Sequence, residues 1–125
     1  MPAIERYDGV NYRVIHKLQR EGKFPENVDV KILSAKFGLI DAQTPIPHYD
    51  QRMDKQRANE LQAQVAREWK KINEKQYKEI FINMGKTYLV AMGGFDLLPP
   101  SAKVRFAEGG IGKKMAAMKL WLQQM

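Results

Sequence analysis

The chain has 125 residues, of which 44% are hydrophobic and 28% are charged, values typical of a single globular domain rather than a disordered or fibrous protein. It has no cysteine and two histidines, which excludes a disulfide scaffold, a thiolate nucleophile, cysteine-bound zinc and a histidine-rich metal site. The formal net charge of +7 permits a polyanionic partner such as nucleic acid but does not require one.

The first half of the chain predicts a helix, a strand and a long loop. The helix begins after Asp8, a candidate N-cap residue, and ends at Gly22, which suits a left-handed C-terminal position. Residues 28–35 first alternate between apolar and polar side chains and are then continuously apolar. This pattern favours a strand whose C-terminal end is covered on both faces. Two prolines exclude a helix within residues 36–50, so we expect an irregular loop there.

The second half predicts two longer helices and two short strands. The clearest helix begins at Asp54 and carries one apolar stripe, and a short strand (79–83) and a short helix (87–92) follow. Residues 103–106 form a weak strand, after which residues 109–112 lead into the last helix. The apolar stripe of the long helix consists of Ala58, Leu61, Val65, Trp69 and Ile72, and that of the last helix of Ile111, Met115, Met118 and Leu122.

Strands separated by helices predict right-handed crossovers and a parallel sheet. We therefore expect one α/β domain over residues 1–125, a small three-layer sandwich with a mostly parallel sheet of three to four strands and helices on both faces. The start of the chain lacks the apolar run of a signal peptide, and the most apolar stretch is interrupted by polar residues. We expect a cytoplasmic protein with no membrane partner.

Ser34, Lys36 and Gly38 follow the first predicted strand. Ligands of open α/β sheets bind outside the carboxyl ends of strands, where a hydroxyl, an ammonium group and a glycine turn can hold an anionic group. In the alternative interpretation, Ser34 satisfies the strand end and Lys36 points to solvent. Tyr88, after the second predicted strand, can reach the same crevice, or it can cap the core with its hydroxyl in water.

The segment before the long helix contains Tyr49 and Asp50. Asp50 can act as a general base or orient a hydroxyl, and Tyr49 can stack on a planar ring. The alternative is a turn in which Asp50 or Asp54 caps the helix.

The glycine-rich segment 109–112 points backbone N–H groups at any anion placed before the last helix. It is not a Walker A loop, because Ala107 and Lys114 stand where glycine and Ser or Thr are needed. It is not a dinucleotide fingerprint, because Met115 takes the place of the third glycine, so we expect no cofactor. A tight strand-to-helix turn is the alternative. The candidate anion-binding residues are Gly110 and Gly112.

Four segments together resemble an uncharacterised bacterial family known only as a domain of unknown function. They are Tyr7-Asp8, residues 32–41 with the run Leu-Ser-Ala-Lys-Phe-Gly-Leu, residues 46–50 ending in Tyr-Asp, and residues 109–112. The chain is more distantly similar to the YaaA peroxide-stress proteins, and more faintly to the catalytic domain of archaeosine synthases. The resemblance implies an α/β sandwich with one cleft shared by Ser34, Lys36, Gly38, Tyr49 and Asp50, with Gly110 and Gly112 near it.

The resemblance also implies a departure at the start of the chain. Members of the family usually begin with an apolar strand that ends in a Ser-Cys-Ser-Lys-like segment, before the Tyr-Asp near position 7. Because the sequence starts at Met1-Pro2, we expect either a start assigned too late or a sheet edge that a partner strand completes, which favours a homodimer.

The leading hypothesis is a protein that binds a nucleotide or nucleic acid at the strand ends, with base or nucleoside chemistry if it is an enzyme. The candidate catalytic residues are Ser34 and Asp50, and the candidate ligand-binding residues are Lys36, Gly38, Tyr49, Tyr88, Gly110 and Gly112. The alternative is a non-catalytic stress-response or interaction module that works as a dimer.

Overall fold

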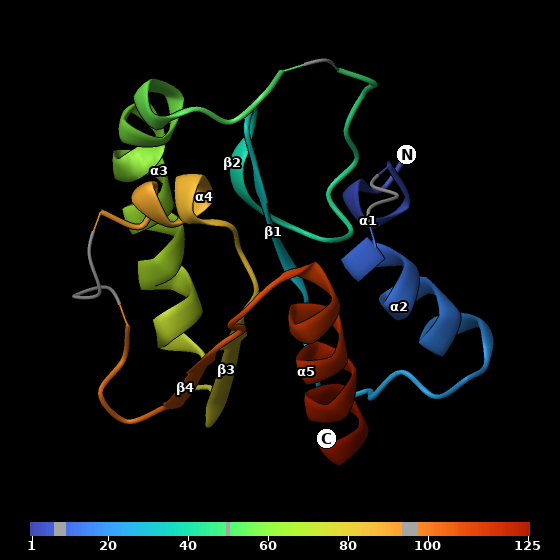
Figure 1. Cartoon of the computed structure of the whole chain (residues 1–125). Helices are drawn as coiled ribbons and strands as arrows, with labels where there is room; N and C mark the ends of the chain where they lie inside the picture. The colour runs from blue at the N-terminus through green and yellow to red at the C-terminus, as the bar shows by residue number, and fades with distance from the viewer. Residues whose placement is uncertain (7–9, 50, 94–97) are drawn as a thin grey trace.

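A computed structural model of the chain describes residues 1–6, 10–49, 51–93 and 98–125 (Figure 1). The predictions for Tyr7, Asp8 and Asp50 lie outside these residues. The elements in chain order are α1 (Ala3–Arg6), α2 (Val10–Arg20), β1 (Lys31–Ser34), β2 (Gly38–Asp41), α3 (Lys55–Glu74), β3 (Glu79–Ile82), α4 (Lys86–Val90), β4 (Lys103–Phe106) and α5 (Ile111–Gln124).

The C-terminal end predicted for α2 and the N-terminal end predicted for α3 are confirmed. Gly22 adopts a φ of +68°, and the N–H of Lys23 donates to the carbonyl of Leu18 at 2.8 Å, which satisfies a carbonyl that the end of α2 leaves open. Asp54 caps α3, since its Oδ1 accepts the N–H of Arg57 at 2.7 Å. Local sequence signals were sufficient for both positions.

The strands form two separate two-stranded sheets instead of one sheet of three to four strands. β1 and β2 are an antiparallel hairpin, while β3 and β4 pair in parallel. β2 lies within the predicted loop 36–50, and that part of the prediction was wrong. Gly38, with a φ of +78°, lets the chain turn back at once, so Leu39 pairs with Leu33. β1, β3 and β4 all run towards the upper part of Figure 1, and β3 leads into α4 while β4 leads into α5.

Two hydrophobic clusters receive alternate side chains from the strands. Ile32 joins the cluster formed with α1, α2 and α5, whereas Leu33 joins the cluster formed with α3 and α4. In β3, Phe81 packs against the cluster of α1, α2 and α5, and Ile82 belongs to the cluster of α3 and α4. The strands therefore carry helices on both faces, as α/β architecture requires.

The stripe predicted on α3 is confirmed, because Ala58, Leu61, Val65 and Trp69 are buried. The stripe predicted on α5 is correct for Met118 and Leu122 and wrong for Ile111, which is 69% exposed. Trp121 completes the buried face of α5. Within the described ranges, no helix combines the length and apolar character that crossing a lipid bilayer needs.

Candidate functional site

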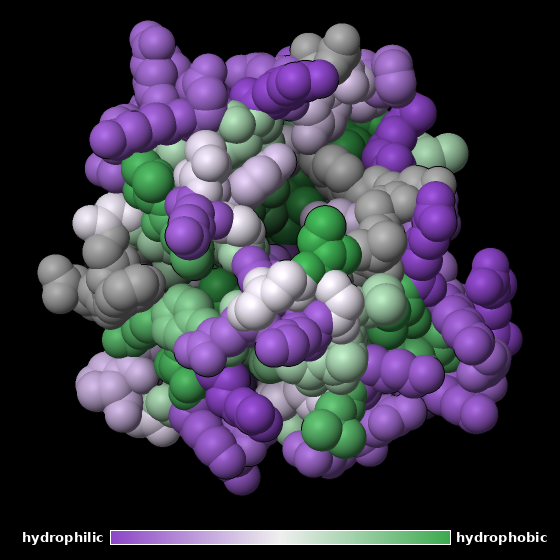
Figure 2. Space-filling model, viewed as in Figure 1, coloured by the Kyte–Doolittle hydropathy of each residue, from purple (hydrophilic) through white to green (hydrophobic). Residues whose placement is uncertain are grey.

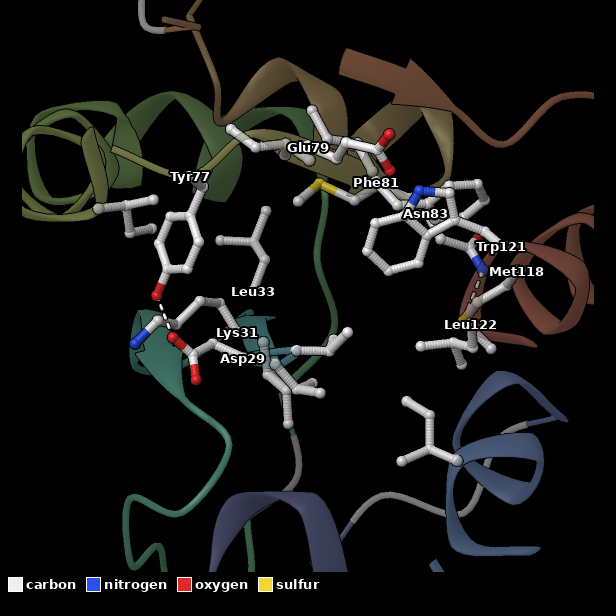
Figure 3. Close-up of a pocket in the computed structure, with 18 of the residues that line it drawn as sticks. Asp29, Lys31, Leu33, Tyr77, Glu79, Phe81, Asn83, Met118, Trp121 and Leu122 are labelled. Atoms are coloured by element: carbon white, nitrogen blue, oxygen red, sulfur yellow. Dashed lines mark hydrogen bonds between the residues drawn. The ribbon is translucent and has the colours of Figure 1, made fainter. Parts of the chain in front are cut away.

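A cavity of about 880 Å³ lies between the two sheets. One wall is β1 with the segment before it, and the opposite wall is β3 with its flanking residues (Figure 3). The space is large for a domain of this size, because protein interiors rarely leave voids larger than a water molecule. Figure 2 shows a hollow with a hydrophobic inner wall between α4, β1 and the start of α5, so the space is open near the carboxyl ends of the strands.

Ser34 ends β1 and is 1% exposed. Its Oγ accepts the N–H groups of Lys36 and Phe37 at 3.2 and 3.1 Å, and it lies 3.0 Å from the hydroxyl of Tyr49. A serine oxygen has two lone pairs, and both are used by these N–H groups, so the Ser34 hydroxyl donates to Tyr49. This geometry favours a positioning role for Ser34 over a nucleophilic one.

Tyr49, which contacts Ser34, has two further tyrosines near it. Tyr12 comes from α2, Tyr49 from the loop before α3, and Tyr88 from α4, and all three line the cavity. Burial, together with the neighbouring hydroxyls of Tyr88 and Tyr49, raises the pKa of Tyr12 to about 12. Burial and then Tyr49 also raise the pKa of Tyr88. Tyr12 and Tyr88 are therefore neutral at physiological pH and offer hydrogen bonds rather than a base.

Lys36 and Gly38 belong to the hairpin turn and do not line the cavity. Arg57 fixes this turn from α3, because its Nε donates to the carbonyl of Ala35 at 2.7 Å and its Nη2 to that of Lys36 at 2.8 Å. The Lys36 ammonium lies 5.5 Å from the centre of the Phe37 ring. The side chain of Lys36 is exposed, as the solvent-facing alternative predicted.

Gly38 combines a φ of +78° with a close approach to the side chain of Gln64 on α3. A Cβ at this position would lie 2.1 Å from the Oε1 of Gln64. The amide of Gln64 needs that space, since its Oε1 accepts the N–H of Leu39 at 2.9 Å and its Nε2 donates to the Leu39 carbonyl at 3.1 Å. A structural role thus accounts for this glycine without a ligand.

Gly110 and Gly112 also lie outside the cavity lining. Gly110 is the N-cap residue of α5, and a Cβ at either glycine would meet no atom within 4 Å. Lys114 connects this turn to the cavity, because its Nζ donates to the carbonyl of Met84 at 3.2 Å and Met84 is a lining residue. The structure therefore brings Tyr88 near Tyr49, which contacts Ser34, and places Lys36, Gly38, Gly110 and Gly112 outside the cavity lining.

Three residues that shape the site, Tyr12, Gln64 and Arg57, were not expected from the sequence. Tyr12 lies three residues before Ile15 and so shares the inner face of α2, which was a usable signal. Gln64 stands three residues after Leu61, at the border of the apolar stripe. Arg57 gave no such signal, because a charged residue near the start of a helix usually faces water.

The fold and the cavity at its strand ends define an α/β protein with a large aromatic-lined cavity. Among the described residues, no group of three or more His, Asp or Glu side chains can hold a metal ion. The chain belongs to a family of unknown function, DUF6884, whose model matches residues 1–120. No curated protein and no solved structure matches the chain.

Proposed function

We propose that the protein binds a nucleotide, free or within a nucleic acid, at the mouth of the cavity near the carboxyl ends of β1 and β3. The observation that supports this most is the cluster of Tyr12, Tyr49 and Tyr88 beside the end of β1. Aromatic rings offer stacking surfaces for bases, and neutral hydroxyls can pair with base edges. The strand ends are also where α/β proteins hold ligands.

The phosphate of such a ligand would meet lysines at the rim. Lys114 contacts the carbonyl of Met84, and Lys86 directly follows Gly85, which also lines the cavity. Lys36 adds an exposed ammonium on the hairpin turn. The excess of basic residues in the whole chain increases the local concentration of polyanions.

If the site is catalytic, the residue we propose as the general base is Asp50. It directly follows Tyr49, whose hydroxyl is fixed by Ser34 at 3.0 Å. The candidate reaction is one at a base or its glycosidic bond, as proposed from the sequence. Ser34 then positions Tyr49.

Isothermal titration calorimetry with the four nucleoside monophosphates and a single-stranded oligonucleotide tests the proposal. We expect Tyr88→Ala to weaken binding by about tenfold or more, which corresponds to the loss of one stacked base. Lys114→Met should reduce the dependence of affinity on salt, while Lys119→Met, an exposed lysine of the same helix, should not. Absence of heat with all ligands, or equal binding by Tyr88→Ala, would contradict the proposal.

The exposed side of α5 supports a second candidate, a homodimeric interaction module. Ile111 and Leu120 are 69% and 56% exposed on this helix. Sedimentation equilibrium tests it, since a dimer formed through α5 should dissociate in Leu120→Glu. A monomer in the unmodified protein would contradict this candidate.

A further inference from the structure

The inner edge of β1 faces the cavity with open backbone groups. Antiparallel strands alternate between residues bonded to the partner strand and residues that point away from it. Val30 is bonded to the partner strand, because its carbonyl accepts the N–H of Ala42. Leu39 lies opposite Leu33 but hydrogen-bonds to the side chain of Gln64, on the side of β2 away from β1. The N–H and C=O groups of Lys31 and Leu33 therefore point away from β2, into the cavity.

The same pattern holds for β3 on the opposite wall. The carbonyl of Lys78 accepts the N–H of Lys103, and the carbonyl of Ile82 accepts that of Ala107. Even-numbered residues of β3 thus face β4, and the backbone groups of Glu79 and Phe81 point the other way. Among the described residues, these groups and those of Lys31 and Leu33 have no hydrogen-bond partner.

The space between these edges has the surroundings of a central strand. Trp69 and Tyr88 cover it from α3 and α4, and Trp121 and Leu122 cover it from α5. A strand buried on both faces is continuously apolar. At the other end from the tyrosine cluster, the hydroxyl of Tyr77 donates to the carboxylate of Asp29 and links the two walls (Figure 3).

We propose that this space is an acceptor slot for one extended apolar segment of a partner polypeptide, which inserts between β1 and β3 and pairs with both. Two-stranded sheets are marginally stable alone, and insertion would join them into one five-stranded sheet. Backbone hydrogen bonds would supply affinity, and the apolar walls would select the side chains. The central sheet of the predicted three-layer sandwich would then be complete.

The chemistry of the slot assigns the partner. A lipid or another apolar small molecule would leave the facing N–H and C=O groups unpaired, which costs free energy in a buried space. A second copy of the chain is disfavoured, because the apolar segments of the described residues are already folded into helices and strands. This inference does not rest on nucleotide binding.

Amide hydrogen exchange of the full chain with a synthetic peptide tests the slot. The probe is acetyl-Lys-Lys-Val-Ile-Leu-Val-Ile-Lys-amide, and its control is the same peptide with N-methyl groups on two adjacent central residues. We expect the probe to slow exchange at Lys31, Leu33, Glu79 and Phe81 by about tenfold or more. Exchange at Ile32 and Ile80, which already face neighbouring strands, should stay unchanged. The methylated peptide should give no protection, because the two methyl groups remove one donor towards each wall and keep the peptide backbone from approaching either strand closely enough to pair.

Three results would overturn the proposal. The first is absence of protection at the four amides with excess probe. The second is equal protection by the methylated peptide, which would indicate apolar filling without strand pairing. The third is protection of the same amides by self-association without peptide, which would assign the slot to a second copy. None of these readouts involves a nucleotide, so the two proposals fail independently.

Discussion

The two edges of the β1–β2 hairpin differ in whether their outward-pointing backbone groups have hydrogen-bond partners. At the outer edge, the side-chain amide of Gln64 pairs with both backbone groups of Leu39, at 2.9 and 3.1 Å, and thus imitates one residue of a neighbouring strand. At the inner edge, Lys31 and Leu33 present the same groups to an open cavity. Proteins usually cover or charge a strand edge to prevent unwanted pairing. Closure of one edge and openness of the other indicate that pairing is prevented outside and left available inside.

The closed edge depends on a glycine one residue away. Gly38 combines a φ of +78° with an approach so close that a Cβ would displace the Gln64 amide from its hydrogen bonds to Leu39. The apparent turn motif of the sequence is therefore a packing motif, and substitutions of these residues test the difference between the two edges.

The largest effect is expected for Gly38→Ala. The new Cβ would overlap the Gln64 amide and strain the backbone, so we expect the free energy of unfolding to fall by about 2–4 kcal/mol in urea titrations. Gly112→Ala is the matched control, because a Cβ there meets nothing and alanine favours the helix, which should add about 0.5 kcal/mol. Equal effects of the two substitutions would show that Gln64 does not close the edge as described.

An intermediate effect is expected for Gln64→Ala, which opens the outer edge without touching the turn. Loss of the two hydrogen bonds to Leu39 should lower the free energy of unfolding by about 1–2 kcal/mol. Amide exchange at Leu39 should then become fast. Gln56→Ala, an exposed glutamine of the same helix, should change neither quantity. Slow exchange at Leu39 in Gln64→Ala would mean that another group covers this edge.

The smallest effect concerns Asp41, opposite Lys31 at the start of the hairpin. The hydrogen bond from Lys31, at 2.7 Å, and then that from the N–H of Gln43 lower the pKa of the Asp41 carboxyl. A lowered pKa in the folded state gives stability that is present above the unfolded pKa and is lost as pH falls through the folded pKa.

Asp41→Asn should therefore remove a small part of the acid dependence of stability. Because this ion pair is partly exposed, we expect a difference of less than about 1 kcal/mol, present at pH 7 and absent below the folded pKa. Thermal unfolding of both proteins from neutral to acidic pH measures it. A difference between the two proteins that persists unchanged at the lowest pH would contradict the assignment.

Short-range signals predicted much of the fold. The glycine at position 22, the cap at Asp54 and the stripe of α3 are local features, and each lies where it was expected. The hairpin was missed, because residues 36–50 combine turn-forming residues with a short apolar run that periodicity cannot assign. Ile111 was misplaced because its helical spacing indicates a face of α5 but not where that face ends.

The candidate site was anticipated only in part. Tyr49 and Tyr88 line the same cavity, and Ser34 contacts the Tyr49 hydroxyl at 3.0 Å without lining the cavity itself. Gly38 was assigned to a ligand because the partner that requires it, Gln64, is 26 positions away in the sequence. Tyr12 was overlooked because helical spacing predicts only that a residue faces the interior. It does not predict that the side chain lines a cavity beside two other tyrosines.

The sequence by itself determined the helices α2 to α5, the α/β class and the residue types available for chemistry, because these follow from local periodicity, capping and composition. Only the tertiary structure decided that the strands divide into two pairs and that their facing edges remain open. Strand pairing depends on contacts between segments that are distant in the sequence. The residues of a single strand do not determine which of its two edges is hydrogen-bonded to a neighbouring strand.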